Sequence, residues 1–459
     1  MNNWLEKNVL AIGAARQGLA ITRYLSGLGA HVLLTDQRPE EEFSAIVDEF
    51  RGLPVRFHFG SHPIALLEKI DLVCVSGGVP LELPIIREAQ KRSIPLTNDT
   101  QIFMEAVSAS VIGITGSSGK TTTTILVGEI AKAGKKEGQT VWVGGNIGKP
   151  LVNDLDSIQA LDIVVLEISS FQLELMTISP EIAAVLNITP NHLDRHADMD
   201  AYIAAKSRIL QFQREEFAAV LNCDNPEVWK FHEIVNGKLF TFSMKPLEMG
   251  QIGAFVQNGS LYLTDGNTTQ RIMGTEEIVL RGEHNIQNAL AACAIAQAAG
   301  FSVEAMRAGI AAVKGVPHRL ELVRELNRVL WFNDSIATTP ERALAAMRSF
   351  KEPLILLLGG RDKKLPWELL AEQAHSQAKH VILFGEAANL IENALHSFEK
   401  GNPPYPLIQC RTLRDAVKQA ADVAKAGDVV LLSPGGTSFD AFRDFEERGE
   451  YFRNLVAAL

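Results

Sequence analysis

This sequence has few cysteines, no long apolar run and no signal-peptide pattern. Its 459 residues include only four cysteines, Cys74, Cys223, Cys293 and Cys410, and none of them forms a CxxC pair. We therefore expect reduced, mostly buried thiols and no thiolate metal site. No run reaches the about 18 apolar residues of a membrane span. The first residues lack the basic start and long apolar stretch of a signal peptide, which predicts a cytoplasmic protein.

Positive charge is also in short supply. Lysine and arginine total 44 against 54 aspartates and glutamates, a net charge of −10. An acidic chain of this kind gives no electrostatic footprint for nucleic acid, so we expect no such partner. Hydrophobic residues make up 46% and charged residues 21%, which is ordinary for a globular protein. The length predicts roughly two to four domains.

Three successive blocks of the chain alternate strand-like and helix-like patterns, which predicts α/β domains with parallel, doubly wound sheets. The first block opens with a strand, a glycine turn and a helix over residues 8–25. The predicted domains are 1–100, 101–314 and 315–459. The first two blocks each open with a strand, and the other strands expected are 31–36, 55–59, 71–76, 162–169, 183–189, 330–334, 353–360, 380–385 and 428–436. Short strands and turn signals over 240–280 predict a small antiparallel appendage to the middle domain.

The strongest motif is a glycine-rich loop between an apolar strand and a helix. It comprises Gly116, Ser117, Ser118, Gly119, Lys120, Thr121 and Thr122. Glycines let backbone N–H groups approach phosphates, and the helix N-terminus adds its dipole. Lys120 is placed to reach the β and γ phosphates of ATP, and Thr121 to place its hydroxyl on Mg²⁺. Ile114 stands where the general phosphate-loop pattern has its first glycine, so this is a variant loop.

Three polar residues follow the phosphate loop in the second block. Glu167 ends an apolar strand, where ligands of parallel sheets gather, and is a candidate for Mg²⁺ or simply a surface acid. His192 follows the next strand and suits the metal shell or a phosphate, although a lone histidine is more often structural. Lys206 lies in a helical segment, where a solvated lysine is the ordinary interpretation.

A set of motifs spread over the whole chain resembles the Mur ligases. In order, these motifs are GAARQG, GITGSSGKTTTT, GGNIGKP, LEISSFQLE, LNITPNHLDRH, AAKSRIL, GEHNIQNALAA, PHRLE, NDSIATTPE and SPGGTSFDAF. The resemblance implies three domains: a Rossmann-like domain for a UDP-linked acceptor, a central ATPase domain and a C-terminal Rossmann-like domain that brings an amino acid. It also implies that ATP phosphorylates the acceptor carboxylate and that the amine then attacks the acyl phosphate.

The resemblance also implies residue roles for catalysis, metal and ATP. The catalytic set is Lys120, Glu167, His192 and Lys206. The Mg²⁺ set is Thr121, Glu167, His192 and Lys206, the lysine as a carbamate. Beyond the phosphate loop, ATP would be bound by Asn288, Arg319 and Asp334, with His284 and Asn285 in the same motif as Asn288. Asn191 stands before His192 where an acid is frequent in the family.

For the two other substrates the resemblance implies binding residues in the first and third domains, together with Asn146 in the middle domain. For the UDP-linked acceptor the matches are Arg16, Gln17, Asp36, Gln37, Arg38, Ser76, Gly78 and Asn146. Ala15 occupies a glycine position of GxGxxG, so NAD is not predicted. For the amino acid the matches are Thr338, Lys363, Ser438, Phe439 and Phe445, with Lys364 as an alternative to Lys363. A cation, hydroxyl donors and an apolar wall suit a dianionic amino acid. Ile336 replaces a lysine frequent in the family.

The segment LEISSFQLE resembles the D-glutamate-adding branch of the family, which implies D-glutamate and UDP-N-acetylmuramoyl-L-alanine as substrates in peptidoglycan precursor synthesis. The L-alanine-adding branch carries an acidic EADESD-like segment there, and the DNPR signature of the diamino-acid branch is absent. Two alternatives stay open: another Mur ligase, such as the L-alanine-adding one, and a non-catalytic ATP-binding regulatory protein. We expect a monomer without membrane insertion.

Overall fold

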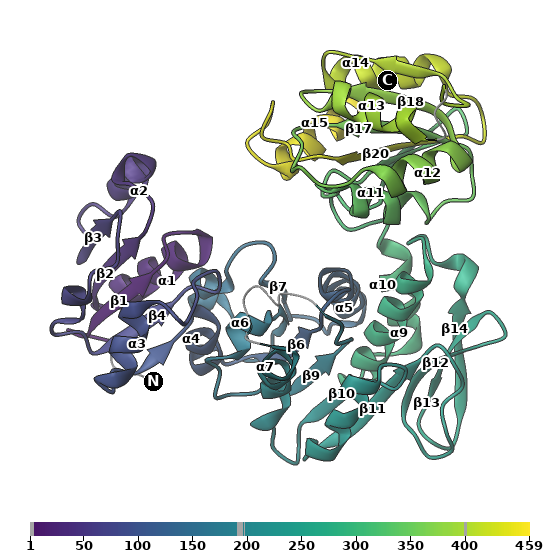
Figure 1. The fold of residues 1–459 in the computed structure, drawn as a ribbon. Helices are drawn as coiled ribbons and strands as arrows, with labels where there is room; N and C mark the ends of the chain where they lie inside the picture. Colours follow the sequence, from purple (N-terminus) through teal and green to yellow (C-terminus); the bar gives the residue numbers. More distant parts are fainter. Residues whose placement is uncertain (1–3, 191–195, 197, 399–401) are drawn as a thin grey trace. The chain divides into compact units, whose positions relative to one another are not determined.

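The computed structural model describes residues 4–190, 196, 198–398 and 402–459. The chain divides into two compact units, the first made of Met1–Glu277 and Ile286–Ala312, the second of Ile278–Asn285 and Val313–Leu459. The first unit holds sheets of five and nine strands and the second unit a sheet of six (Figure 1). These sheets correspond to the three α/β blocks of the sequence and form the three-domain α/β fold that the sequence predicts.

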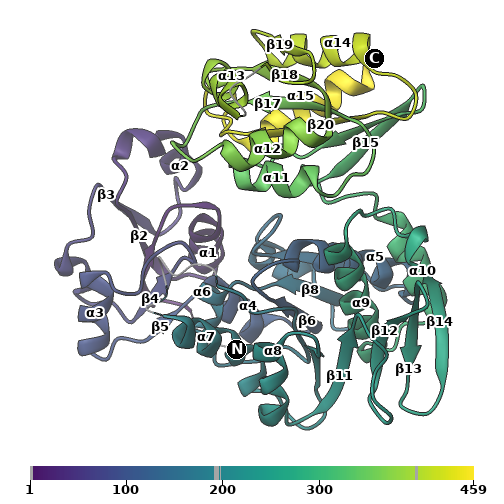
Figure 2. The same cartoon turned by 45° about the vertical axis from the view of Figure 1, so that its right-hand side comes forward.

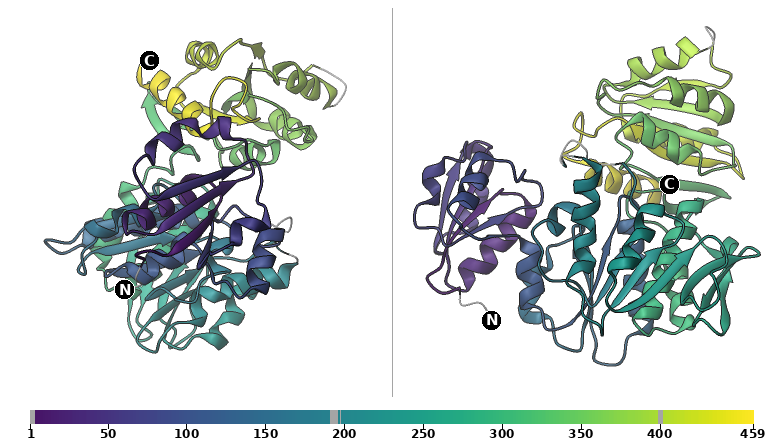
Figure 3. Two further views of the ribbon diagram at one scale, coloured as in Figure 1. Left: turned by 90° about the vertical axis from the view of Figure 1, so that its left-hand side faces the viewer. Right: turned by 60° about the horizontal axis from the view of Figure 1, so that its bottom comes forward.

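The N-terminal sheet is fully parallel, with the strand order β3-β2-β1-β4-β5. Its elements, with those leading into the central domain, are β1 (Asn8–Ile12), α1 (Arg16–Gly27), β2 (His31–Asp36), η1 (Glu40–Phe43), α2 (Ser44–Glu49), β3 (Val55–Phe59), η2 (Ile64–Leu67), β4 (Leu72–Val75), α3 (Pro84–Lys91), β5 (Leu96–Thr97) and α4 (Asp99–Ala106). Helices cover both faces of the sheet (Figure 3, right, purple). The strand order reverses between β1 and β4, the place where such sheets bind ligands.

The central sheet has the order β14-β13-β12-β11-β10-β9-β6-β8-β7. Its elements are β6 (Ser110–Thr115), α5 (Lys120–Gly134), β7 (Val141–Gly145), η3 (Leu151–Ser157), β8 (Ile163–Glu167), α6 (Ser170–Leu173), β9 (Ile182–Val185), α7 (Met199–Gln211), β10 (Ala218–Asn222), α8 (Pro226–Trp229), η4 (Lys230–Ile234), β11 (Lys238–Ser243), β12 (Gly253–Gln257), β13 (Ser260–Thr264), β14 (Thr269–Gly274), η5 (Thr275–Glu277), α9 (Glu283–Ala298) and α10 (Val303–Ala312). The predicted antiparallel appendage is present as β12–β14, and it continues the main sheet because β12 pairs in parallel with β11.

The C-terminal sheet has the order β15-β16-β20-β17-β18-β19, parallel except for the edge strand β15. Its elements are β15 (Glu321–Leu326), β16 (Val329–Asn333), α11 (Pro340–Met347), β17 (Leu354–Gly359), α12 (Glu368–Gln377), β18 (Ala378–Phe384), α13 (Ala388–Ser397), β19 (Leu407–Gln409), α14 (Leu413–Val423), β20 (Val429–Gly435) and α15 (Phe445–Ala457). Residues of α11, α12 and α13 share one core with the sheet, and those of α14 and α15 share another (Figure 2).

Burial on both faces explains why these strands consist of continuous apolar runs. Every residue of β17, LILLLG, is buried, as is every residue of β20. Such runs are typical of parallel sheets covered by helices on both sides. Cys74 and Cys293 are buried and the other two thiols partly so, and all four are free. Within the described residues, no helix is long and apolar enough to cross a bilayer.

Candidate active site

The phosphate loop leaves the carboxyl end of β6, an interior strand of the central sheet between β9 and β8, and enters α5. Gly119 has a left-handed backbone, with φ at +78°, and a Cβ on it would lie 2.2 Å from Oδ1 of Asn288. Only glycine fits this position without strain. The loop therefore lies directly beside Asn288, a residue predicted for ATP.

The segment after β9 holds the phosphate loop in shape. The amide of Ser117 donates to the carbonyl of Asn187, and the amide of Ser118 donates to the Asn187 side chain at 2.8 Å. Ser117 Oγ lies 3.1 Å from the Thr189 carbonyl and 2.9 Å from the Tyr202 hydroxyl. Sequence reasoning assigned no role to Asn187, although it lies in the quoted motif LNITPNHLDRH, or to Tyr202, whose local pattern is that of an ordinary core residue.

The two predicted catalytic lysines meet at one carbonyl oxygen. Lys120 Nζ and Lys206 Nζ each donate to the Gly116 carbonyl at 2.9 Å, and Lys206 also reaches Thr115 Oγ1 at 3.3 Å. Lys206 is 1% exposed, and its ammonium lies 4.7 Å from the ring centre of Tyr202. Burial, reinforced by Lys120, lowers the pKa of Lys206 well below its ordinary value. The helix lysine is thus a buried amine beside the phosphate loop and not a solvated one.

Glu167 links the phosphate loop to the neighbouring strand. It is 2% exposed at the end of β8, so it is not a surface acid. Its Oε2 accepts from Thr121 Oγ1 at 2.8 Å, and its Oε1 accepts from Asn146 Nδ2 at 3.0 Å. A carboxylate and a hydroxyl side by side at the helix start are oxygen donors of the kind that Mg²⁺ prefers.

His192 and Asn191 lie outside the described residues. Among the described residues, no group of three or more His, Cys, Asp and Glu side chains has the geometry of a metal site. The predicted Mg²⁺ set differs from such a group, because it contains one carboxylate, one hydroxyl, a histidine and a modified lysine.

Seven of the eight residues predicted for the acceptor lie at the carboxyl ends of β1, β2 and β4. The eighth, Asn146, follows β7 in the central sheet and contacts Glu167 instead. Gly13 has φ at +97°, and a Cβ on Gly18 would lie 1.7 Å from the Gly13 carbonyl oxygen. Ser76 Oγ donates to that same oxygen at 3.1 Å, which ties the β1 and β4 loops together. Gln17 Nε2 is buried and has no hydrogen-bond partner among the described residues. A polar group of this kind is costly unless a ligand or water satisfies it.

Asp36 at the end of β2 organises the same turn. It accepts from the amide of Ala14 at 2.7 Å and from the Arg38 guanidinium at 3.0 and 2.9 Å. Burial opposes ionisation, but these hydrogen bonds outweigh it and lower the pKa of Asp36 to about 2. Arg38, Gln37, Arg16 and Gly78 are exposed at this edge.

In the second unit, Asp334 follows β16 and is almost fully buried. Its carboxyl group accepts from Ser433 Oγ at 2.7 Å and from the amide of Leu320 at 3.2 Å. Burial raises the pKa of Asp334 to about 7, although these hydrogen bonds and Arg319 act against the rise. Burial lowers the pKa of His284, and the charge of Arg319 lowers it further. Arg319 therefore acts electrostatically on both Asp334 and His284 within this unit.

The residues predicted for the amino acid come from three loops of the second unit and from the start of α15. Lys363 Nζ donates to Thr338 Oγ1 at 3.4 Å, so two of them lie together. Ser438 is buried, Phe439 is 61% exposed, and Phe445 lies edge-on to His318.

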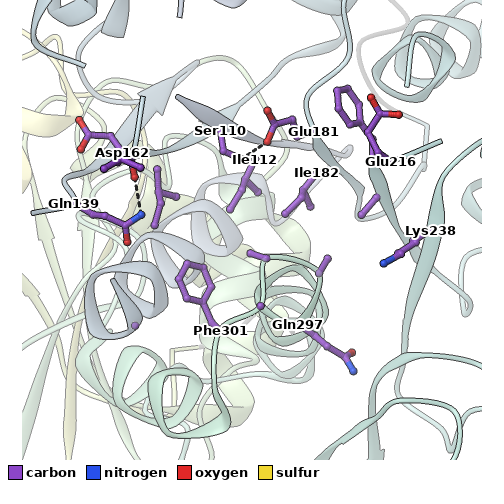
Figure 4. Close-up of a pocket in the computed structure, with 18 of the residues that line it drawn as sticks. Ser110, Ile112, Gln139, Asp162, Glu181, Ile182, Glu216, Lys238, Gln297 and Phe301 are labelled. Carbon is purple, nitrogen blue, oxygen red and sulfur yellow. Dashed lines mark hydrogen bonds between the residues drawn. The ribbon is translucent and has the colours of Figure 1, made fainter. Parts of the chain in front are cut away.

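A hollow of about 1000 Å³ opens at the opposite edge of the central sheet, at the amino ends of its strands (Figure 4). Ser110 and Ile182 line it from the strand starts, and Gln297 and Phe301 line it from the end of α9 and beyond (Figure 4). Ligands of parallel α/β sheets bind at the carboxyl ends, where the phosphate loop lies. We assign this hollow no part in the site.

The fold and the phosphate loop define a nucleotide-binding α/β protein of three domains. Models of three protein families match it: the Mur ligase MurD-like N-terminal domain over residues 7–98, the Mur ligase middle domain over 114–296, and the Mur ligase glutamate ligase domain over 318–436. The chain therefore belongs to the Mur ligase family, whose members are ATP-dependent, ADP-forming ligases.

Similar proteins cover the chain nearly end to end. The UDP-N-acetylmuramoylalanine–D-glutamate ligase of Clostridium tetani is 39% identical over 99% of this chain and 97% of its own length. The protein of the same name from Symbiobacterium thermophilum is 38% identical over 99% of both. Among solved structures, the UDP-N-acetylmuramate–alanine ligase MurC of Thermotoga maritima superposes with a TM-score of 0.59 at 18% identity, covering 98% of this chain and 99% of its own. This structural likeness shows the shared fold.

Proposed function

We propose that this protein joins D-glutamate to the free carboxylate of UDP-N-acetylmuramoyl-L-alanine at the expense of ATP, a cytoplasmic step of peptidoglycan precursor synthesis. The observation that carries the proposal is the cluster at the ends of β6 and β8, where Lys120, Lys206 and Glu167 surround the start of α5. The full-length similarity to D-glutamate ligases supports the choice of amino acid.

The chemistry accounts for a cluster rich in cations. A carboxylate is a poor electrophile, so the γ-phosphoryl group of ATP is first transferred to the acceptor carboxylate, giving an acyl phosphate and ADP. The amine of D-glutamate then adds to the acyl carbon, loses a proton, and phosphate departs as the amide forms. Two anions approach each other in the first step, and Lys120 at the helix N-terminus reduces their repulsion.

The donor set at the start of α5 fits Mg²⁺, since Thr121 Oγ1 and Glu167 Oε2 are oxygens 2.8 Å apart. The ion, when bound, would screen phosphate charge. Lys206 is proposed to carry a carbamate, which adds two oxygens and a negative charge to this group. A buried amine with a lowered pKa favours the neutral form that carbamylation by CO₂ requires. His192 completes the proposed set.

The other ligands are assigned by domain, and the proposed domains are 1–100, 101–314 and 315–459. The acceptor is proposed to bind at Arg16, Gln17, Asp36, Gln37, Arg38, Ser76, Gly78 and Asn146. ATP is proposed to bind the phosphate loop, Asn288, Arg319 and Asp334, and D-glutamate to bind Thr338, Lys363, Ser438, Phe439 and Phe445. The unpartnered Gln17 Nε2 supports the first assignment, and the contact of Lys363 with Thr338 supports the last. Because one chain supplies all these residues, we propose that the protein acts as a monomer.

An amino-acid panel tests the function directly. Phosphate release is measured with ATP, Mg²⁺, the UDP-linked acceptor and one amino acid at a time, and the amide product is identified by mass spectrometry. We expect release only with D-glutamate present, and none when any component is omitted. Release with L-alanine and UDP-N-acetylmuramate instead would identify another branch of the family. If the complete mixture yields no amide, the proposed ligase activity is refuted and the alternative of a non-catalytic ATP-binding protein is favoured.

A further inference from the structure

Two loops of the second unit carry the side chains assigned to the amino acid. One follows β16 and includes Thr338, and the other follows β20 and includes Ser438. The amide of Gly435, the last residue of β20, donates to the carbonyl of Ala337 at 2.9 Å, so the first loop contacts the start of the second. Thr437 in the second loop also exchanges two backbone hydrogen bonds with Arg361. Further contacts hold the two loops to each other.

Arg448 on α15 contacts both loops with its buried guanidinium group. Its side chain is 0% exposed. Its Nε donates to Ser335 Oγ at 3.0 Å, its Nη2 donates to the Ser335 carbonyl at 2.8 Å, and both Nη atoms donate to the Gly436 carbonyl at 3.2 Å. Ser335 Oγ in turn donates to the Phe445 carbonyl at 2.8 Å. One planar guanidinium thus fixes both loops and the start of α15, a geometry that a lysine cannot reproduce.

The charge of Arg448 has no direct counter-ion. Within the described residues, none of the ion pairs involves Arg448, and the carboxylate of Asp440 acts on it through a longer-range attraction. Burial lowers the pKa of Arg448 to about 10, so the group stays cationic at neutral pH. A buried cation held only by neutral oxygens is costly. An anionic ligand above the two loops would gain from this charge without touching it.

We propose that Arg448 is a positioning residue for the amino-acid substrate, holding the Ser335–Thr338 and Gly436–Ser438 loops in register and favouring a dianionic amino acid through its unpaired charge. The proposal rests on the proposed function for the identity of that amino acid. The loop geometry itself can be measured without any substrate.

The test compares Arg448→Lys, which keeps the charge but loses the fork, with Arg448→Met, which loses both. Arg453→Lys on the same helix is the matched control, since Arg453 donates to Glu321 and Glu450 and does not contact either loop in the described structure. Hydrogen–deuterium exchange of peptides spanning 335–339 and 436–441 reports loop order. Steady-state kinetics report KM for D-glutamate, ATP and acceptor separately, and circular dichroism checks folding.

For Arg448→Lys we expect faster exchange in both loops and a KM for D-glutamate raised about 10-fold or more, with KM for ATP and acceptor changed less than about 2-fold. In Arg448→Met the preference for D-glutamate over D-glutamine should fall further, and the control should match the wild type. A folded Arg448→Lys with unchanged loop exchange would overturn the positioning role. An equal rise in all three KM values would overturn the specificity role. If the wild type forms no amide with D-glutamate, the proposed function and the specificity role both fall, while the exchange data still decide the positioning role.

Discussion

Replacing Gly119 with alanine should destabilise the phosphate loop by an amount that depends on Asn288. Gly119 has φ at +78°, and the added Cβ would lie 2.2 Å from Asn288 Oδ1. A left-handed alanine costs about 1–2 kcal/mol, and displacing a packed, buried side chain costs about 1–3 kcal/mol. Gly119→Ala should therefore lower the local stability of the loop by about 2–5 kcal/mol when Asn288 is present. In an Asn288→Ala background only the backbone cost of about 1–2 kcal/mol should remain.

A double-mutant cycle measures this dependence. Hydrogen–deuterium exchange of peptides covering α5 gives the local opening free energy of the wild type, both single variants and the double variant. Gly138→Ala is the matched control, because Gly138 has φ at +83° but no atom within 4 Å of an added Cβ. The expected coupling is about 1–3 kcal/mol. Additivity within about 0.5 kcal/mol would show that the close approach of Asn288 to Gly119 is absent in solution.

Further substitutions test the other parts of the site. Lys120→Ala should abolish phosphate release in the complete assay, and normal turnover in this variant would mean that the phosphate loop is misassigned. Lys206→Ala should lose most activity and regain part of it with added short carboxylates, which an unmodified lysine would not explain. Asp36→Asn should raise KM for the acceptor about 10-fold or more without changing KM for ATP, since charge-assisted hydrogen bonds are lost, and an unchanged acceptor KM would refute the assignment. Burial raises the pKa of Asp334 from 3.8 to about 7, so the folded state holds this proton more tightly than the unfolded chain. This stabilisation is complete below about pH 4 and is lost as pH rises through about 7, and urea unfolding of Asp334→Asn should show a flatter pH dependence in that window.

The long apolar strands were predictable because they are buried on both faces and end at turn signals. The expected strands at 31–36 and 55–59 coincide with β2 and β3. The short strands β5 and β19, of two and three residues, were missed because so few residues carry no periodicity. β10 and β15 were also missed, the latter because an edge strand with charged residues lacks an apolar run.

The site residues that we predicted from the residues themselves stand at chain positions with a local signature, and the others were implied by the family resemblance. The phosphate loop has its glycines, and Glu167 ends an apolar strand. Arg448 had no such signature, since a basic residue within a helix is ordinarily exposed. Its partners Ser335 and Gly436 lie more than ten residues away along the chain, 113 and 12 positions respectively. Only the folded domain brings the three together.

The sequence alone determined the class of fold, the phosphate loop and the family motifs, because hydrophobic pattern and glycine placement act over neighbouring residues. Only the tertiary structure decided which charged side chains are buried and which groups they contact. The local pattern left Lys206 an ordinary helix lysine, and only the family resemblance implied a role for it. In the fold it is a buried amine that shares the Gly116 carbonyl with Lys120. Burial and the partners of a charged group depend on segments far apart along the chain, and these together set its pKa and chemistry.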